Sequence, residues 1–263
     1  MRTILKRRVI LAAMAGICDG DFCFRAAKSG AGMVTLGGLN FDEGTVLAGE
    51  MIRRRGRKEF DVKLDSLERF LREEVSKALK GGAPVAINVR AATLRGILFA
   101  GNLVSKSGAT ALEIDAHCRQ PEMMAVGAGQ ALLNRLETLS EWIMCLKESF
   151  NVKVILKWRG NVVDDLTVAK LAEKAGADAI HIDAMKQGVE CGDLELIRKI
   201  SENVNVFLIG NNSVRDVNSA IEMLNSGADA VSIARATLND PSVVGKIALG
   251  VEEKMKQKEN LKF

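Results

Sequence analysis

The sequence lacks several features, and each absence excludes a class of protein. It has no tyrosine and only 4% aromatic residues, so no aromatic platform for stacking single-stranded nucleic acid is visible. No apolar run approaches the roughly twenty residues that a helix needs to cross a bilayer. The apolar stretch near the N-terminus is better interpreted as a first strand than as a signal peptide. We therefore expect a cytoplasmic protein that does not enter a membrane.

The cysteine pattern argues against stabilisation by disulfide bonds or by a structural metal. There are 5 cysteines and only 2 histidines, with no CxxC pair. An odd number of cysteines without ligand spacing disfavours a disulfide framework and a zinc or iron–sulfur site. We expect no metal and a reducing environment.

The net charge of +4 is mild, but basic residues gather at 6–8 and 53–58. Each cluster is open to two interpretations, a solvated loop or a contact with a phosphate backbone.

Four similar segments show how the chain is organised. Each has a glycine after a helical pattern, where the left-handed C-terminal position favours glycine, and then a short apolar strand. The segments begin at Ser29, Ser107, Ala175 and Ser226. Four further apolar stretches complete the set, at 8–15, 84–89, 153–159 and 204–210.

Eight strands that alternate with helical patterns imply parallel pairing and right-handed crossovers. The sequence therefore predicts an α/β fold, a closed (β/α)8 TIM barrel. A doubly wound open sheet is the alternative, although no GxGxxG follows the first strand. We expect a single domain over 1–263, with a helical insertion at about 40–82 and an N-cap at Ser213.

In such a barrel the active site lies at the C-terminal ends of the strands. Lys157 and Arg159 share one side of their strand, so both cations are expected to line the barrel mouth and to need an anionic or electron-rich ligand. An exposed rim for these two, and a structural core role for His181, remain open. The polar or special residues at the strand ends are Met14, Asn88, Arg90, Asp115, His117, Cys118, Lys157, Arg159, His181, Asp183, Gly210, Asn211, Asn212, Ala234 and Arg235.

The last two strand ends predict a phosphate site. Gly210 would let the backbone approach closely, and a helix that starts near Ser213 would present free N–H groups. Arg235 adds a positive charge, and barrels commonly bind phosphate at this pair of loops. Cys118 lies between His117 and Arg119, a setting that could tune a thiol as an acid or nucleophile. The other cysteines are interpreted as small buried apolar residues.

These motifs together resemble the tRNA-dihydrouridine synthases. LAAMAGICDGDFCFR resembles the first-strand signature of that family, and EIDAHCRQP resembles its cysteine loop. VILKWRG, HIDAMKQG and FLIGNNSV resemble its later strand ends. The dihydroorotate dehydrogenases share much of the pattern. The chain is similar to a short, divergent, archaeal-type member of these FMN-binding barrels.

The resemblance implies FMN in the barrel mouth and NAD(P)H as its electron donor. Cys118 matches the catalytic cysteine, which would protonate one carbon of a C=C bond while reduced flavin delivers hydride to the other. The implied cofactor-binding positions are Met14, Asn88, Lys157, His181, Gly210, Asn211, Asn212, Ala234 and Arg235. The implied substrate-binding positions are Asp115, His117 and Arg159.

The chain also departs from the family pattern. Asp115 stands where the family has Asn, His117 where it has Gly, and Arg119 where it has Pro. The further helical domain with which the synthases grip tRNA is not expected. The predicted partner is therefore a small-molecule or pyrimidine substrate, with tRNA as a second possibility; the oligomeric state is left open.

Two other functions remain as alternatives. One is a non-redox, phosphate-binding synthase or lyase that uses Lys157, and the other is a flavin- or nucleotide-binding barrel without turnover.

Overall fold

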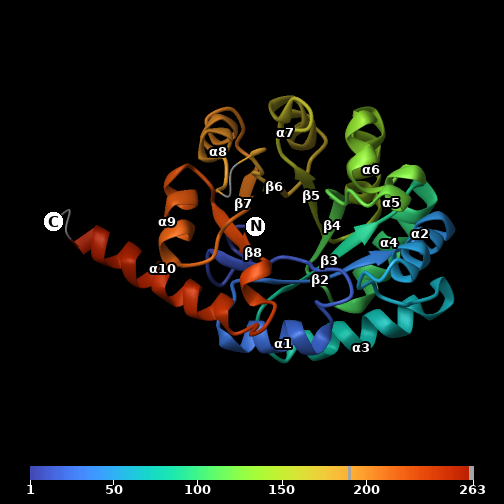
Figure 1. Cartoon of the computed structure of the whole chain (residues 1–263), viewed down its shortest axis with the longest axis horizontal. Helices are drawn as coiled ribbons and strands as arrows, with labels where there is room; N and C mark the ends of the chain where they lie inside the picture. The colour runs from blue at the N-terminus through green and yellow to red at the C-terminus, as the bar shows by residue number, and fades with distance from the viewer. Residues whose placement is uncertain (189–190, 261–263) are drawn as a thin grey trace.

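The structure, a computed structural model, describes residues 1–188 and 191–260, with side chains described up to residue 257. Eight parallel strands close into a barrel in sequence order, β1 to β8, with helices around the outside (Figure 1). The prediction of a (β/α)8 TIM barrel is confirmed. Within the described ranges, no helix is long and apolar enough to cross a membrane.

The strands are short and almost fully buried. They are β1 Val9–Leu11, β2 Val34–Asn40, β3 Val85–Arg90, β4 Ala111–Ala116, β5 Lys153–Arg159, β6 Ala179–Asp183, β7 Phe207–Asn211 and β8 Ala230–Ile233.

The α-helices are α1 Gly20–Ser29, α2 Glu43–Arg54, α3 Leu67–Leu79, α4 Leu94–Ser107, α5 Pro121–Ala125, α6 Leu136–Ser149, α7 Asp165–Lys174, α8 Leu194–Ser201, α9 Val217–Asn225 and α10 Val243–Asn260. The 3-10 helices are η1 Leu64–Ser66, η2 Gly129–Asn134 and η3 Arg235–Thr237.

Two helices lie between β2 and β3, but they have different roles. α3 packs between α1 and α4 and so belongs to the outer ring of the barrel (Figure 1). α2 packs on α5 and the end of β2 instead. The addition to the ring is therefore α2 with the coil that follows it, a smaller part of the chain than the 40–82 insertion suggested by the sequence.

Local sequence signals explain most element ends. The four glycines at the repeated strand–helix junctions, Gly30, Gly108, Gly176 and Gly227, have φ between 85° and 115°, as the sequence pattern predicts. The predicted N-cap at Ser213 is wrong. α9 begins at Val217, and the Asp216 side chain caps it in a capping box with Ser219. Asp216 directly precedes Val217, the first apolar residue of the helix, and is the better capping signal.

The barrel interior has an apolar floor and a polar upper part. The inward residues nearest the N-terminal ends of the strands form one apolar cluster, Ile10, Met33, Ala86, Ala111, Ile155, Ala179, Phe207, Ile209 and Ala230. On β5 the other parity carries Val154, Leu156 and Trp158, which pack with the helices in the larger cluster. Because side chains alternate along a strand, the polar residues two and four positions further along also point inward.

Candidate functional site

Five side chains from five strands meet in a buried polar layer above the apolar floor. Glu113 on β4 accepts hydrogen bonds from Asn88 Nδ2 at 2.8 Å and from His181 Nδ1 at 2.6 Å. The second His181 nitrogen, Nε2, lies 2.7 Å from Ser232 Oγ. Lys157 Nζ lies 3.7 Å from Glu113 Oε1. The layer thus places the Glu113 carboxylate opposite the Lys157 ammonium, and the His181 imidazole connects Glu113 on β4 to Ser232 on β8.

The electrostatics of this layer fix its protonation state. Burial alone would raise the pKa of Glu113, but Lys157, His181 and hydrogen bonds lower it to about 2. Burial and the Lys157 charge lower the pKa of His181. Glu113 is therefore ionised at neutral pH, and His181 is the neutral imidazole that donates from Nδ1 and accepts at Nε2.

A second group lies one step nearer the barrel mouth. Arg90 at the end of β3 donates from Nη2 to Glu59 Oε2 at 2.8 Å and to the Gly38 carbonyl at 3.1 Å. Arg90 Nε is 3.7 Å from Asp115 Oδ2, which is too long for a hydrogen bond. The side chains of Arg90 and Glu59 are only 2% and 4% exposed, so the pair is fully inside the protein.

The loop after β4 presents Cys118 beside this pair. Asp115 Oδ1 accepts from the backbone N–H groups of His117 and Cys118, both at 2.9 Å. The Cys118 carbonyl accepts from Gln130 N at 2.8 Å. Gly129 has φ 59°, and a Cβ there would lie 2.3 Å from that carbonyl oxygen. Asp115 is thus occupied in holding the cysteine loop, a role that the prediction of substrate contact did not include.

The thiol of Cys118 is held in its protonated form. Burial and the nearby Asp115 carboxylate raise its pKa to about 11, and Arg90 opposes that rise. A thiol at neutral pH suits a proton donor better than a nucleophile, because nucleophilic attack requires the thiolate.

A third group of polar side chains, centred on Asp183, connects the C-terminal ends of β4 and β6 at the barrel mouth. His117 Nε2 lies 2.7 Å from Asp183 Oδ2, and Asn212 Nδ2 donates to Asp183 Oδ1 at 2.6 Å. Arg159 Nη1 is 3.9 Å from the same carboxylate. Burial would raise the pKa of Asp183, but His117, Asn212 and Arg159 hold it well below its usual range.

The structure therefore brings together most of the predicted site residues. Asn88, Asp115, His117, Cys118, Lys157, Arg159, His181 and Asn212 belong to the three connected groups. Lys157 and Arg159 both extend to the inner side of β5, where they face Glu113 and Asp183.

The predicted phosphate segments are placed less simply. A Cβ on Gly210 would lie 2.7 Å from Met223 Cγ, so the glycine there makes room for α9. Asp216 occupies the N-terminus of α9, where the prediction had free N–H groups. Arg235 and Ala234 lie where η3 begins, and Arg235 is exposed. Met14 is half-buried after β1, and its carbonyl accepts from the N–H groups of Ile17 and Cys18. The prediction of a phosphate at these loops stays a prediction.

Five residues of the network were given no role in the sequence analysis, although two of them were named there as polar strand ends: Arg90, Asp183, Glu113, Ser232 and Glu59. Glu113, Asp183 and Ser232 share strand parity with residues that were chosen, so a signal for them existed. Glu59 lies in coil between α2 and η1, where no periodicity points to the barrel. The expectation that the remaining cysteines are buried is wrong for Cys191, which is exposed, and for Cys145, which is half-buried.

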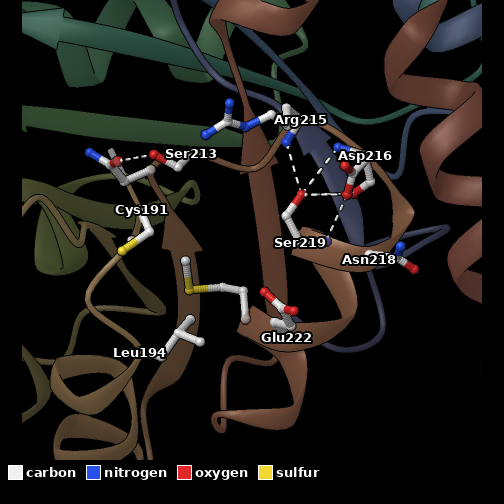
Figure 2. Close-up of a pocket in the computed structure, with 11 residues that line it drawn as sticks. Cys191, Leu194, Ser213, Arg215, Asp216, Asn218, Ser219 and Glu222 are labelled. Atoms are coloured by element: carbon white, nitrogen blue, oxygen red, sulfur yellow. Dashed lines mark hydrogen bonds between the residues drawn. The ribbon is translucent and has the colours of Figure 1, made fainter. Parts of the chain in front are cut away.

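A separate pocket of about 240 Å³ lies between the loops after β6 and β7. Figure 2 shows Cys191 and Leu194 on one side of it and Arg215, Asn218 and Glu222 on the other. Its wall includes Asn212, which also contacts Asp183, so this pocket adjoins the mouth network. The capping bonds between Asp216 and Ser219 leave the α9 N-terminus occupied (Figure 2).

The basic clusters are largely engaged within the fold. Arg53 and Arg55 pair with Asp61 and Glu122 at 2.5 and 2.8 Å. In the part of the chain that the structure describes, Arg57 and Lys58 make no ion pair. The cluster at 6–8 directly precedes β1, so it lies at the N-terminal end of the barrel, opposite the C-terminal strand ends that carry the candidate site.

The fold and the three groups define a (β/α)8 barrel whose polar residues converge at the C-terminal ends of its strands. The model of the dihydrouridine synthase (Dus) family matches residues 10–262. The chain belongs to the dihydrouridine synthase family.

Several relatives match most of the chain, and a solved structure shares its fold. The chain is 35% identical to an uncharacterized protein of Methanocaldococcus jannaschii, over 89% of this chain and 90% of that protein. It is 26% identical to a probable tRNA-dihydrouridine synthase of Rhizobium leguminosarum, over 94% and 74% of the two chains. The catalytic subunit of dihydroorotate dehydrogenase B (NAD(+)) of Fusobacterium nucleatum is 24% identical, over 71% and 68%. Thiamine phosphate pyrophosphorylase from Pyrococcus furiosus shares the fold, with a TM-score of 0.59 at 15% identity over 97% and 98%.

Proposed function

We propose that this protein is an FMN-dependent oxidoreductase that acts on a C=C bond of a pyrimidine-like substrate. The observation that carries the proposal is the position of Cys118. Its thiol, protonated at neutral pH, lies beside Arg90 and Asp115, above a buried layer that contains Lys157 and His181. A protonated thiol beside a buried polar layer is an arrangement that suits protonation of one carbon of an activated double bond.

The residues of the mouth fit a flavin. Among the residues that the structure describes, the Lys157 ammonium makes no hydrogen bond, although it is 5% exposed. Thr35 Oγ1, also buried, has no hydrogen-bond partner within the described part of the chain. Buried polar groups normally have partners, so an electron-rich ring would satisfy donors that the protein leaves open. Asn88, Lys157 and His181 would hold the ring, and Asn211, Asn212, Ala234 and Arg235 would hold the phosphate side.

FMN would supply hydride transfer, and NAD(P)H would be the source of the electrons. The protein would supply the rest. Lys157 would place a positive charge at the ring edge, with Glu113 holding the ammonium in position. Asp115 would fix the loop that aims the Cys118 thiol, and that thiol would give up its proton to the carbon that does not receive hydride. His117 and Arg159 would border the substrate on the opposite side of the mouth.

The substrate we propose is a small molecule that contains a pyrimidine-like ring. Uridine in tRNA, suggested by the names of several relatives, is the second candidate. Arg57 and Lys58 are the residues of the 53–58 cluster that would contact a phosphate backbone. The internal pairing of Arg53 and Arg55 limits that surface.

Three measurements on the purified protein test this function. The first is the absorbance spectrum, which should show bound flavin that is bleached by NADPH or dithionite. The second is reoxidation of the reduced protein by uracil derivatives and by unmodified tRNA in single-turnover mixing. The third is the same reaction with Cys118→Ala, which should slow it by about 10²–10⁴-fold. Cys191→Ala, at an exposed thiol outside the network, is the matched control and should leave the rate unchanged.

Each outcome has a defined meaning. A colourless protein that does not bind added FMN contradicts the proposal. Bound flavin that no acceptor reoxidises would favour a flavin-binding barrel without turnover. Full activity in Cys118→Ala would remove the cysteine from its role as proton donor.

A further inference from the structure

A short coil segment covers the barrel mouth near Arg90. It comprises residues 57–63, between α2 and η1, and we call it the strap. The strap lies against the loop after β1, since a Cβ on Gly16 would be 2.5 Å from Glu59 N and 2.7 Å from the Lys58 carbonyl carbon. From this crossing Glu59 extends inward, and its side chain is 4% exposed.

Arg90 is incompletely satisfied by the protein. Its Nη2 has two acceptors, Glu59 and the Gly38 carbonyl. Its Nε and Nη1 atoms are buried without a hydrogen-bond partner in the described chain. A buried donor without an acceptor costs about 1–3 kcal/mol, and more when the group is charged. The two unpaired donors of Arg90 lie close to Cys118, and the charge of Arg90 acts to lower the pKa of that thiol.

We propose that Arg90 is the residue that selects the substrate, and that it binds a carboxylate carried by the substrate ring after the strap lifts. This inference rests on the proposed function and names its substrate class. In the present structure the Glu59 carboxylate occupies the place of the ligand's carboxylate. Glu59 therefore competes with the substrate for Arg90.

The charges around Arg90 support an acidic ligand. With the strap in place, the guanidinium faces two carboxylates, those of Glu59 and Asp115. When Glu59 withdraws, the Asp115 carboxylate is the one carboxylate of the described residues that stays within 4 Å of Arg90. A ligand carboxylate restores the arrangement that the protein itself uses, and carboxylates are the acceptors that match a guanidinium best. Because Arg90 is 2% exposed, a ligand can reach it only after the strap lifts.

The same arrangement explains one departure from the family pattern. An Asn at position 115 would retain the oxygen that accepts from the His117 and Cys118 N–H groups. Its amide nitrogen, however, would replace the oxygen that lies 3.7 Å from Arg90 Nε. That would bring two donors together, so Asp115 is the residue that suits the presence of Arg90.

The attachments of the strap are compatible with lifting. In the described chain, no backbone N–H from Lys58 to Val62 donates to a backbone carbonyl. At its first residue the strap is anchored by the Arg57 N–H, which donates to the Ile52 carbonyl at 3.3 Å. Beyond that residue it is held by side chains, through Glu59 to Arg90, Asp61 to Arg53 and the edge-to-face contact of Phe60 with Phe70 at 5.9 Å. Phe60 and Val62 also pack against the main apolar core. Segments with few backbone hydrogen bonds open at low free-energy cost.

The experiment is calorimetric titration of the purified full-length protein with three probes. These are uracil, uracil 5-carboxylate and uracil 6-carboxylate, which differ only in the acidic group. At least one carboxylate should bind about 10–100-fold more tightly than uracil. Arg90→Gln should remove that difference. Glu59→Gln should act in the opposite direction and tighten carboxylate binding, because it removes the competing group.

The opposite signs separate selection from a structural role. An ion pair that only stabilised the mouth would give weaker binding in both variants. Arg7→Gln, which breaks the pair with Glu252 at 3.2 Å far from the mouth, is the matched control and should change neither affinity. If Arg90→Gln fails to fold, two other variants still test the inference. Glu59→Gln should tighten carboxylate binding, and Arg90→Lys should weaken it, though by less than the loss of the positive charge would.

Two results would overturn the inference. One is equal binding of uracil and its carboxylates by the unmodified protein. The other is weaker carboxylate binding in Glu59→Gln. Failure of the proposed function is distinguishable, since a protein without flavin could still show the opposite-sign pattern. If the protein turns over with flavin but neither Arg90→Gln nor Glu59→Gln changes the affinity for the carboxylates, the selection of substrate by Arg90 is rejected and the proposed function stands.

Discussion

Glu113 Oε2 lies 2.6 Å from His181 Nδ1 in the centre of the barrel, and both side chains are at most 1% exposed. The pair connects β4 to β6, and Asn88 and Ser232 extend the connection to β3 and β8. Four of the eight strands are thus joined through side chains as well as through the sheet. Any change to this layer should affect stability and the site together.

Replacement of Glu113 by Gln should destabilise the protein at neutral pH by about 3–5 kcal/mol, because it leaves the buried Lys157 ammonium without its carboxylate. Since the pKa of Glu113 is lowered to about 2, its contribution is present above the unfolded value of about 4.3 and is lost as pH falls toward 2. The acid-side decline in unfolding free energy should therefore be shallower in Glu113→Gln. Urea denaturation at pH 7, 4 and 3 measures both effects. Glu195→Gln, at an exposed ion pair, should change stability by less than about 1 kcal/mol.

Alkylation of Cys118 should be slow at neutral pH and should rise with pH toward about 11, because only the thiolate reacts. Two variants should shift this profile in opposite directions. Asp115→Asn removes a charge that raises the pKa of the thiol, so labelling should become faster at a given pH. Arg90→Gln removes a charge that lowers the pKa, so labelling should become slower. Iodoacetamide labelling followed by mass spectrometry resolves Cys118 from the exposed Cys191. Identical profiles in all three proteins would contradict the electrostatic account.

The sequence allowed the barrel to be predicted because its signals are local and repeated. A glycine after each of four helices, followed by a short apolar strand, is enough to count strands and order them. Strand parity then placed Lys157, Arg159 and His181 inside the barrel without any tertiary information. These inferences depend only on the alternation of side chains along a strand.

Other parts of the site could not be read in this way. Glu59 enters the mouth from coil, where no period relates a residue to a direction. The sequence suggests that Gly210 lets the backbone approach a phosphate, but its small size makes room for Met223 on α9, the next helix along the chain. The sequence analysis placed the start of α9 at Ser213, whereas the loop after β7 runs on to Asp216, which caps the helix. Each case is decided by tertiary packing.

Lys157 should act through its charge rather than as a covalent group. It faces the ionised Glu113 at 3.7 Å, so we expect no trapping by borohydride in the presence of carbonyl substrates. Lys157→Met should lower stability, because it leaves the buried Glu113 carboxylate without its cation, and the folded protein should bind FMN more weakly. It should also lower the two-electron potential of the bound flavin by about 20–60 mV, because a positive charge near the ring favours the reduced anion. Dye-coupled redox titration measures the shift. Borohydride trapping at Lys157 would favour the non-redox synthase or lyase alternative instead.

Asn212 should be sensitive to replacement for two separable reasons. Its φ of 98° lies in the left-handed region, which Gly tolerates, Asn accepts and other residues adopt at a cost of about 1–3 kcal/mol. Its Nδ2 also donates to Asp183 at 2.6 Å. Asn212→Gly removes the hydrogen bond, but glycine adopts this positive φ without strain. Asn212→Ala removes the same bond and also adds backbone strain.

We therefore expect Asn212→Ala to be less stable than Asn212→Gly by about 1 kcal/mol or more in thermal or urea unfolding. Both variants should raise the pKa of Asp183, because each removes a bond that lowers it. Carbon-13 NMR titration of the Asp183 carboxyl would detect that change. Equal stability of the two variants would mean that the loop after β7 relaxes to a different backbone path. In that case the hydrogen bond to Asp183, rather than the backbone conformation, would be what requires Asn at this position.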